Sequence, residues 1–85
     1  MSTYDFKDGK GPVPAHKHPN GGGWVADTAT VYEKAFVGPD AQVFGNAEVY
    51  GKARVSGNAR VSGNALVYGN ARVYGNAQVY GNARV

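Results

Sequence analysis

Valine occurs at every sixth residue from Val25 to Val85, and alanine follows each of these valines except the last by four residues. The clearest copy of the unit is V-Y-G-N-A-R at residues 67–72. Self-similarity at a fixed short period is typical of a solenoid, and hexapeptide periods occur in β-helices. This period constrains the fold more than any other feature of the chain.

An α-helix does not fit the period. Residues six apart are separated by about 600° around a helix, so the valines would share no buried stripe. Each unit from Gly45 to Gly81 also contains a glycine, which costs about 1 kcal/mol in a helix interior. In a strand, the alanine and valine of A-x-V-x point to one face. The Gly-Asn pair that follows supplies a turn.

One strand and one turn bury too little surface alone, so three units must close into a coil of about 18 residues. The G-N-A-R-V units resemble those of the hexapeptide-repeat superfamily, whose fold is a left-handed parallel β-helix with the aliphatic residue inside. The resemblance predicts an all-β chain in which residues 24–85 form about three and a half coils. The left hand is implied by the resemblance alone, because ordinary parallel crossovers are right-handed.

Residues 1–23 lack the repeat and hold three of the four prolines. We interpret them as an extended N-terminal arm or cap. Trp24 stands just before the first valine, and we expect its indole to cover the open end of the first coil, with Tyr4 and Phe6 beside it. The alternative is a disordered tail.

Composition restricts the partners. The net charge is +3, which favours anionic partners only weakly, and we do not expect nucleic acid. There is no cysteine, so no disulfide or thiolate metal site can form. No apolar run is long enough for a membrane span or a signal peptide, so we expect no membrane partner and a cytoplasmic location.

Folding the repeat at 18 residues per coil sorts the outward residues onto three faces. Face one carries Thr30, Tyr32, Glu48, Tyr50, Leu66, Tyr68 and Arg84. Face two carries Phe36, Gly38, Arg54, Ser56, Arg72 and Tyr74. Face three carries Trp24, Ala26, Gln42, Phe44, Arg60, Ser62, Gln78 and Tyr80.

On face one, the 18-residue coil predicts a column of Tyr32, Tyr50 and Tyr68 with Leu66 beside it. A flat, rigid, apolar surface of this kind is typical of an oligomer interface. The burial available to one small chain falls short of its ordering cost, which also favours assembly. We expect a homo-oligomer, and a trimer because the superfamily usually trimerises. The alternative is a ladder that stabilises only its own sheet.

On face two, the 18-residue coil predicts a basic column of Arg54 and Arg72. The two side chains repel one another unless an anion lies between them. Phe36 can take one guanidinium through a cation–π contact. With Tyr74 at its edge, the column is our candidate site for a small anionic ligand, and Arg60 is a further candidate. The alternative is a solvated face with the arginines splayed apart.

Catalytic residues are missing from the coils. Acyltransferases of the superfamily use a histidine from a coil or an extruded loop, whereas the histidines here are His16 and His18 in the arm. We therefore expect no catalytic residue, no cofactor and no enzymatic activity. H-K-H with Asp5, Asp8 or Asp27 as a third ligand is only a weak metal signal, so we assign no metal site.

Three functions remain open. The first is a non-catalytic oligomeric binding module for a small anionic or nucleotide-like ligand at subunit junctions. The second is a structural or assembly protein, such as a rigid rod segment. The third is a degenerate acyltransferase. The chain resembles short hexapeptide-repeat proteins of bacteria and phages without assigned activity. It stops in mid-coil at Val85, so we expect either more chain or another chain at this end.

Overall fold

The computed structural model describes residues 3–6, 9 and 11–85, and every regular element within them is a β-strand. The repeat folds into strands of two or three residues, because each A-x-V-x segment is extended and each Gly-Asn pair turns the chain. These strands are β3 (Trp24–Ala26), β4 (Thr30–Val31), β5 (Phe36–Val37), β6 (Gln42–Val43), β7 (Glu48–Val49), β8 (Arg54–Val55), β9 (Arg60–Val61), β10 (Leu66–Val67), β11 (Arg72–Val73) and β12 (Gln78–Val79).

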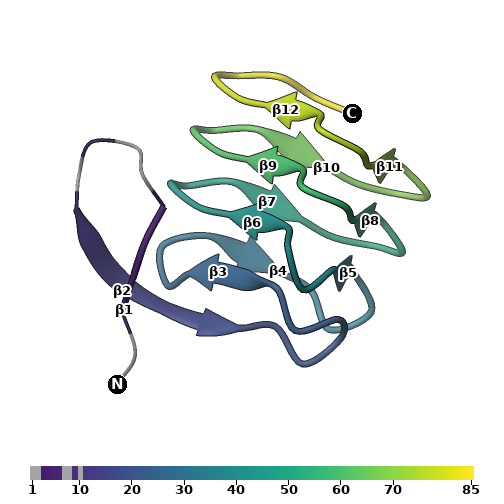
Figure 1. Ribbon diagram of the computed structural model, residues 1–85. Coiled ribbons are helices and arrows are strands. Elements are labelled where there is room, and N and C mark those ends of the chain that lie inside the picture. The colour runs from purple at the N-terminus through teal and green to yellow at the C-terminus, as the bar shows by residue number, and fades with distance from the viewer. Residues whose placement is uncertain (1–2, 7–8, 10) are drawn as a thin grey trace.

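Each coil lies on the previous coil, because strands that are three apart in order pair in parallel (Figure 1). Face one is the sheet β4-β7-β10, face two is β5-β8-β11, and face three contains β3-β6-β9-β12. Register partners are 18 residues apart, as in Val25 with Val43. The predicted all-β parallel solenoid with an 18-residue coil is therefore confirmed. Its left hand stays an implication of the resemblance.

The valines and alanines fill the interior. Val37, Val43, Val49, Val55, Val61 and Val67 are all fully buried. Burial falls off where a coil has no neighbour above it, and Val85 is 42% exposed. Between coils, backbone N–H groups donate to the carbonyls of the next coil, as from Thr30 to Ala47 at 2.9 Å. These ladder bonds satisfy backbone groups that burial alone would leave unpaired.

The segment before the repeat contains a β-hairpin. Its strands β1 (Thr3–Asp5) and β2 (Pro12–Lys17) pair in antiparallel fashion. The second half of β2 also pairs antiparallel with β3, which joins the hairpin to the sheet of face three. The predicted extended arm is thus partly a hairpin, and the first solenoid strand begins at Trp24.

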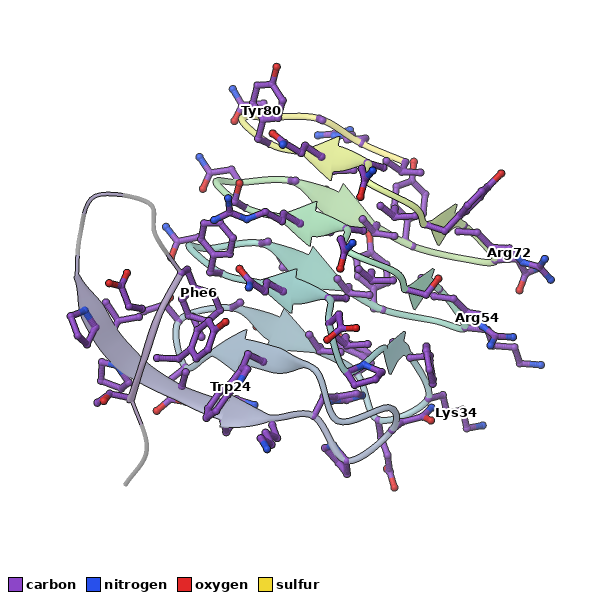
Figure 2. All side chains as sticks on the ribbon, viewed as in Figure 1. Phe6, Trp24, Lys34, Arg54, Arg72 and Tyr80 are labelled. Atoms are coloured by element: carbon purple, nitrogen blue, oxygen red, sulfur yellow. The ribbon has the colours of Figure 1, made fainter. Side chains whose placement is uncertain are left out.

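The hairpin covers part of face three with a second apolar cluster. Phe6 is 1% exposed and stacks on Phe44, with ring centroids 4.8 Å apart. Tyr4 stacks on Trp24 at the same centroid separation. Phe6 and Trp24 lie on the same side of the molecule in Figure 2. These contacts place Tyr4 and Phe6 beside Trp24, as expected from the sequence.

The first coil is covered by other residues than Trp24, which corrects the prediction of Trp24 as the end cap. Trp24 alternates with the inward-facing Val25, so its ring lies on the outer surface of face three, where Lys17 also contacts it. The segment from His18 to Gly23 lies along the free edge of β5 instead. The N–H of Gly23 donates to the Val37 carbonyl at 2.9 Å, and the N–H of Val37 donates to the Asn20 carbonyl at 3.0 Å. The buried imidazole of His18 also donates through Nε2 to the Ala35 carbonyl at 2.7 Å.

Candidate anion-binding site

Two arginines stand in register on face two. Arg54 of β8 and Arg72 of β11 are parallel Cα partners, one coil apart. Each is followed by a buried inward valine, so both side chains point outward and both are exposed. Figure 2 shows the two guanidinium groups projecting from the same side of the molecule. The repeat thus stacks two like charges at the strand separation of about 4.8 Å.

An open groove of about 470 Å³ lies along this column, lined by Arg54, Ser56, Arg72 and Tyr74. Tyr74 follows Arg72 by two residues, so its ring shares the outer surface and is 68% exposed. The groove therefore combines guanidinium donors, a hydroxyl group and a free aromatic face. That set suits a phosphate-bearing ligand with a planar ring.

Phe36 contacts Arg54 on the side away from Arg72. The guanidinium carbon of Arg54 lies 5.1 Å from the centroid of the Phe36 ring, one coil below. This cation–π contact uses the face of the guanidinium group, so its N–H groups can still bind an anion. The contact anticipated from the sequence is present.

Two lysines extend the basic column, and the sequence interpretation missed both. Lys34 and Lys52 are 18 residues apart and occupy the corner just before face two. They line a second groove of about 430 Å³ together with Asn20, Phe36 and Arg54. Their 18-residue spacing is visible in the sequence and places them one above the other. Strand alternation does not reveal them, because both stand at corners and not at outward strand positions.

The four cations are electrostatically uncompensated. Within the part of the chain that the structure describes, neither lysine nor either arginine forms an ion pair with a carboxylate. Glu33 shares a neighbouring depression with Lys34 and Lys52 but is not within ion-pair distance of either. Like charges on neighbouring coils repel one another, by about 1 kcal/mol for a pair 4 Å apart in water and by more near a protein surface. An anion bound among them would offset this repulsion.

Arg60 does not belong to this site, which corrects its inclusion among the ligand-binding candidates. It lies on face three, over the Phe44 ring at 5.0 Å, and donates through Nη2 to the Phe6 carbonyl. The contact with Phe44 lies within the solenoid, whereas the bond to the Phe6 carbonyl holds the N-terminal segment on it. The sequence could not show this, because the carbonyl that Arg60 binds is 54 residues away in the chain.

The tyrosine column of face one is present. Tyr32 and Tyr50 have ring centroids 5.6 Å apart with a 45° tilt, and Tyr50 stacks on Tyr68 at the same separation with an interplanar angle of 15°. Leu66 lies half-buried beside them. The rings stabilise the sheet by stacking, whether or not a second chain covers them. The oligomer interface stays a prediction.

The two histidines have separate contacts. His16 donates from Nδ1 to the Asp27 carboxylate at 2.8 Å and is exposed, whereas His18 is buried against the first coil. Asp8 lies outside the described residues. Within residues 3–6, 9 and 11–85, no three side chains of His, Cys, Asp or Glu form a metal-binding group.

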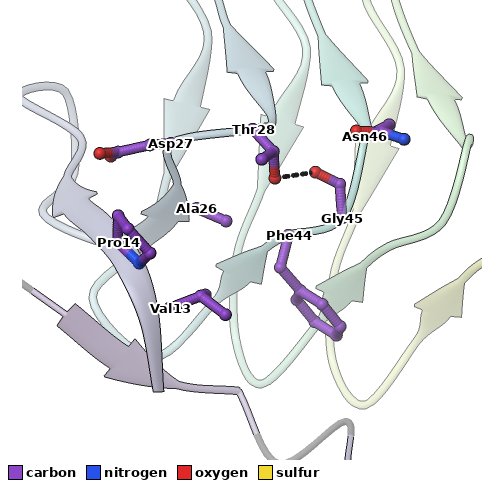
Figure 3. Close-up of a pocket in the computed structure, with 8 residues that line it drawn as sticks. All are labelled: Val13, Pro14, Ala26, Asp27, Thr28, Phe44, Gly45 and Asn46. Carbon is purple, nitrogen blue, oxygen red and sulfur yellow. Dashed lines mark hydrogen bonds between the residues drawn. The ribbon is translucent and has the colours of Figure 1, made fainter. Parts of the chain in front are cut away.

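A small pocket of about 300 Å³ lies between the hairpin and the first corners of the repeat (Figure 3). It is lined by Val13, Pro14, Ala26, Asp27, Thr28, Phe44, Gly45 and Asn46. The hydroxyl of Thr28 donates to the Gly45 carbonyl at 2.5 Å, which ties the two corners together. The Asp27 carboxylate makes this pocket unfavourable for anions, so an anionic ligand is better matched by face two.

Comparison with known proteins agrees with the repeat. The model of the YdcK β-solenoid repeat matches residues 41–57, 53–68, 65–78 and 77–85, which together span more than half of the chain. No curated protein and no solved structure matches the chain. No helix in the described part is long and apolar enough to cross a membrane. By its repeat and its coils, the chain belongs to the YdcK β-solenoid repeat family.

Proposed function

We propose that this protein is a non-catalytic binding module that holds a phosphate-bearing anion on face two. The observation that carries the proposal is the pair of arginines, Arg54 and Arg72, stacked in register over a groove without a carboxylate partner.

The chemistry of the groove supports a phosphate ligand. Guanidinium groups present planar forks of N–H donors that match phosphate oxygens. Arg54 and Arg72 approach from adjacent coils, and the Ser56 hydroxyl also lines the groove. The exposed ring of Tyr74 offers a stacking surface for a base or another flat group. Each charge-assisted hydrogen bond contributes about 1.5–3 kcal/mol.

Calorimetric titration tests this function. We expect an adenine nucleotide to bind in the micromolar range, and Arg54→Gln or Arg72→Gln to weaken it at least tenfold. Arg84→Gln is the matched control, since it removes the same charge from face one, where Arg84 pairs with Leu66. If the face-two variants bind as well as the wild type, the arginines form only a solvated face.

A structural role is the second candidate, and the tyrosine column favours it. Tyr32 and Tyr68 are 54% and 42% exposed, which is a large aromatic surface for a free chain. Such a surface suits a homotrimer of the kind found in the hexapeptide-repeat superfamily, to which the G-N-A-R-V units point. The two roles are compatible, because face one and face two are separate sheets.

A further inference from the structure

The two grooves of face two form one continuous track. Arg54 lines both, with Ser56, Arg72 and Tyr74 on one side and Lys34, Lys52 and Phe36 on the other. Figure 2 shows Lys34, Arg54 and Arg72 following one another along a single edge of the solenoid. The track therefore runs parallel to the solenoid axis, across the strands.

The four cations of this track come from three successive coils. Lys34 belongs to the coil of β5, Lys52 and Arg54 to the coil of β8, and Arg72 to the coil of β11. With about 4.8 Å between neighbouring strands, the charges extend over roughly 10 Å. A single phosphate can bridge two adjacent coils, but it cannot reach all three.

The environment of each cation indicates that the whole track is available. Lys34, Lys52, Arg54 and Arg72 are all exposed, and none of them pairs with a described carboxylate. The backbone of Lys34 is held by a hydrogen bond from the Asn20 amide to its carbonyl at 3.5 Å. Phe36 orients Arg54 between the two lysines and Arg72. The two arginines thus stand on the sheet of face two, and the two lysines stand at the corners beside it.

We propose that the ligand of face two is a linear oligophosphate, with at least three phosphate groups laid along the solenoid axis. The inference rests on the proposed function and names the class of its ligand. Arg72 and Arg54 hold the first two phosphates, and Lys52 and Lys34 hold the next. Tyr74 lies at the opposite end from the lysines and stacks on the base when the oligophosphate belongs to a nucleotide.

The test is a calorimetric series with orthophosphate, pyrophosphate and tripolyphosphate, alongside AMP, ADP and ATP. We expect affinity to rise about tenfold with each added phosphate, because each gains a charge-assisted hydrogen bond. ATP should bind more tightly than tripolyphosphate in the wild type. Tyr74→Ala should remove that difference and leave tripolyphosphate binding unchanged.

A double substitution of the two lysines tests whether they bind the third phosphate. Lys34→Gln with Lys52→Gln should abolish the gain from the third phosphate and leave binding of AMP and ADP within twofold of the wild type. Arg84→Gln with Lys17→Gln removes two charges away from face two and is the matched control. Far-ultraviolet circular dichroism and thermal unfolding confirm that each variant is folded.

The possible results distinguish the anion site of face two from its assignment to an oligophosphate. Equal affinity for pyrophosphate and tripolyphosphate, with loss on Arg54→Gln, would overturn the oligophosphate and keep the anion site. Absence of binding by every probe would overturn both. An equal loss of tripolyphosphate affinity in the lysine double variant and in its control would mean that net charge alone sets the affinity, and would overturn the oligophosphate. Tight binding of a single-stranded oligonucleotide without binding of tripolyphosphate would also overturn it and would assign a different ligand.

Discussion

From Gly45 to Gly81 each corner of the repeat has a glycine, and two separate reasons can require it. Gly57 and Gly75 stand one coil apart with φ near +65° and +66°, a region that disfavours residues with a Cβ. A Cβ on Gly57 would also lie 2.9 Å from the backbone N and O of Gly75. Gly75 has open space above it, so it carries only the first requirement.

This difference predicts unequal effects of one substitution at two equivalent corners. Gly75→Ala should destabilise the fold by about 1–2 kcal/mol, the cost of the left-handed conformation. Gly57→Ala should cost about 1–3 kcal/mol more, because the coils must separate to accept the methyl group. Urea unfolding measures both variants. Equal losses would mean that the coils adjust freely at the corner.

His18 stabilises the N-terminal end of the solenoid through one buried hydrogen bond. It is 3% exposed, and its imidazole satisfies the Ala35 carbonyl, which faces away from the next coil. His18→Leu should destabilise the protein by about 1–3 kcal/mol, the cost of an unsatisfied buried acceptor. His16→Leu, which breaks only the exposed contact with Asp27, should cost less than about 1 kcal/mol. Similar losses by denaturant unfolding would contradict this role for His18.

At the scale of elements, the hairpin is attached to face three by the pairing of β2 with β3 and by a cluster of side chains around the Phe6 ring. Phe6 contacts both Tyr4 and Phe44, and its carbonyl accepts from Arg60. Tyr4 of β1, Phe44 just after β6 and Arg60 of β9 therefore meet at Phe6. A truncation there should loosen the hairpin and spare the coils.

Phe6→Ala should remove about 3–5 kcal/mol of local stability. Amide hydrogen exchange should then show lost protection in β1 and the first half of β2, with Val49 and Val61 protected as before. Trp24 is the single tryptophan, so its fluorescence should shift to longer wavelength as Tyr4 leaves its ring. Unchanged exchange in β1 would show that strand pairing alone holds the hairpin.

The elements also show what the sequence could and could not predict. The coils were predictable because Val and Ala recur in strict register, and the same period placed Arg54 beside Arg72 and stacked the tyrosines. The hairpin has no period, and its main contact joins Phe6 to Phe44, 38 residues away. The period alone therefore cannot show that Arg60 binds the Phe6 carbonyl. Strand alternation likewise does not place Lys34 and Lys52, because both stand at corners outside the strands.

For the molecule as a whole, face three is partly covered by the hairpin, whereas faces one and two are open. Face two is charged, so it suits an ionic ligand, and face one carries the stacked tyrosine rings with the half-buried Leu66 beside them. A stable protein interface needs about 1,000 Å² of buried surface or more. On a chain of 85 residues, face one is the apolar surface best suited to supply it.

We therefore expect sedimentation equilibrium to give the mass of a homotrimer at micromolar concentration. Leu66→Glu should shift the equilibrium toward monomer, because it places a desolvated charge in the interface and leaves the interior valines untouched. Gln78→Glu, an exposed change on face three, is the matched control and should leave the mass unchanged. A folded monomer in the wild type would mean that the tyrosine column stabilises its own sheet alone. In that case the anion site of face two must be complete within one chain, and the Arg54 and Arg72 variants should show the same losses at every protein concentration.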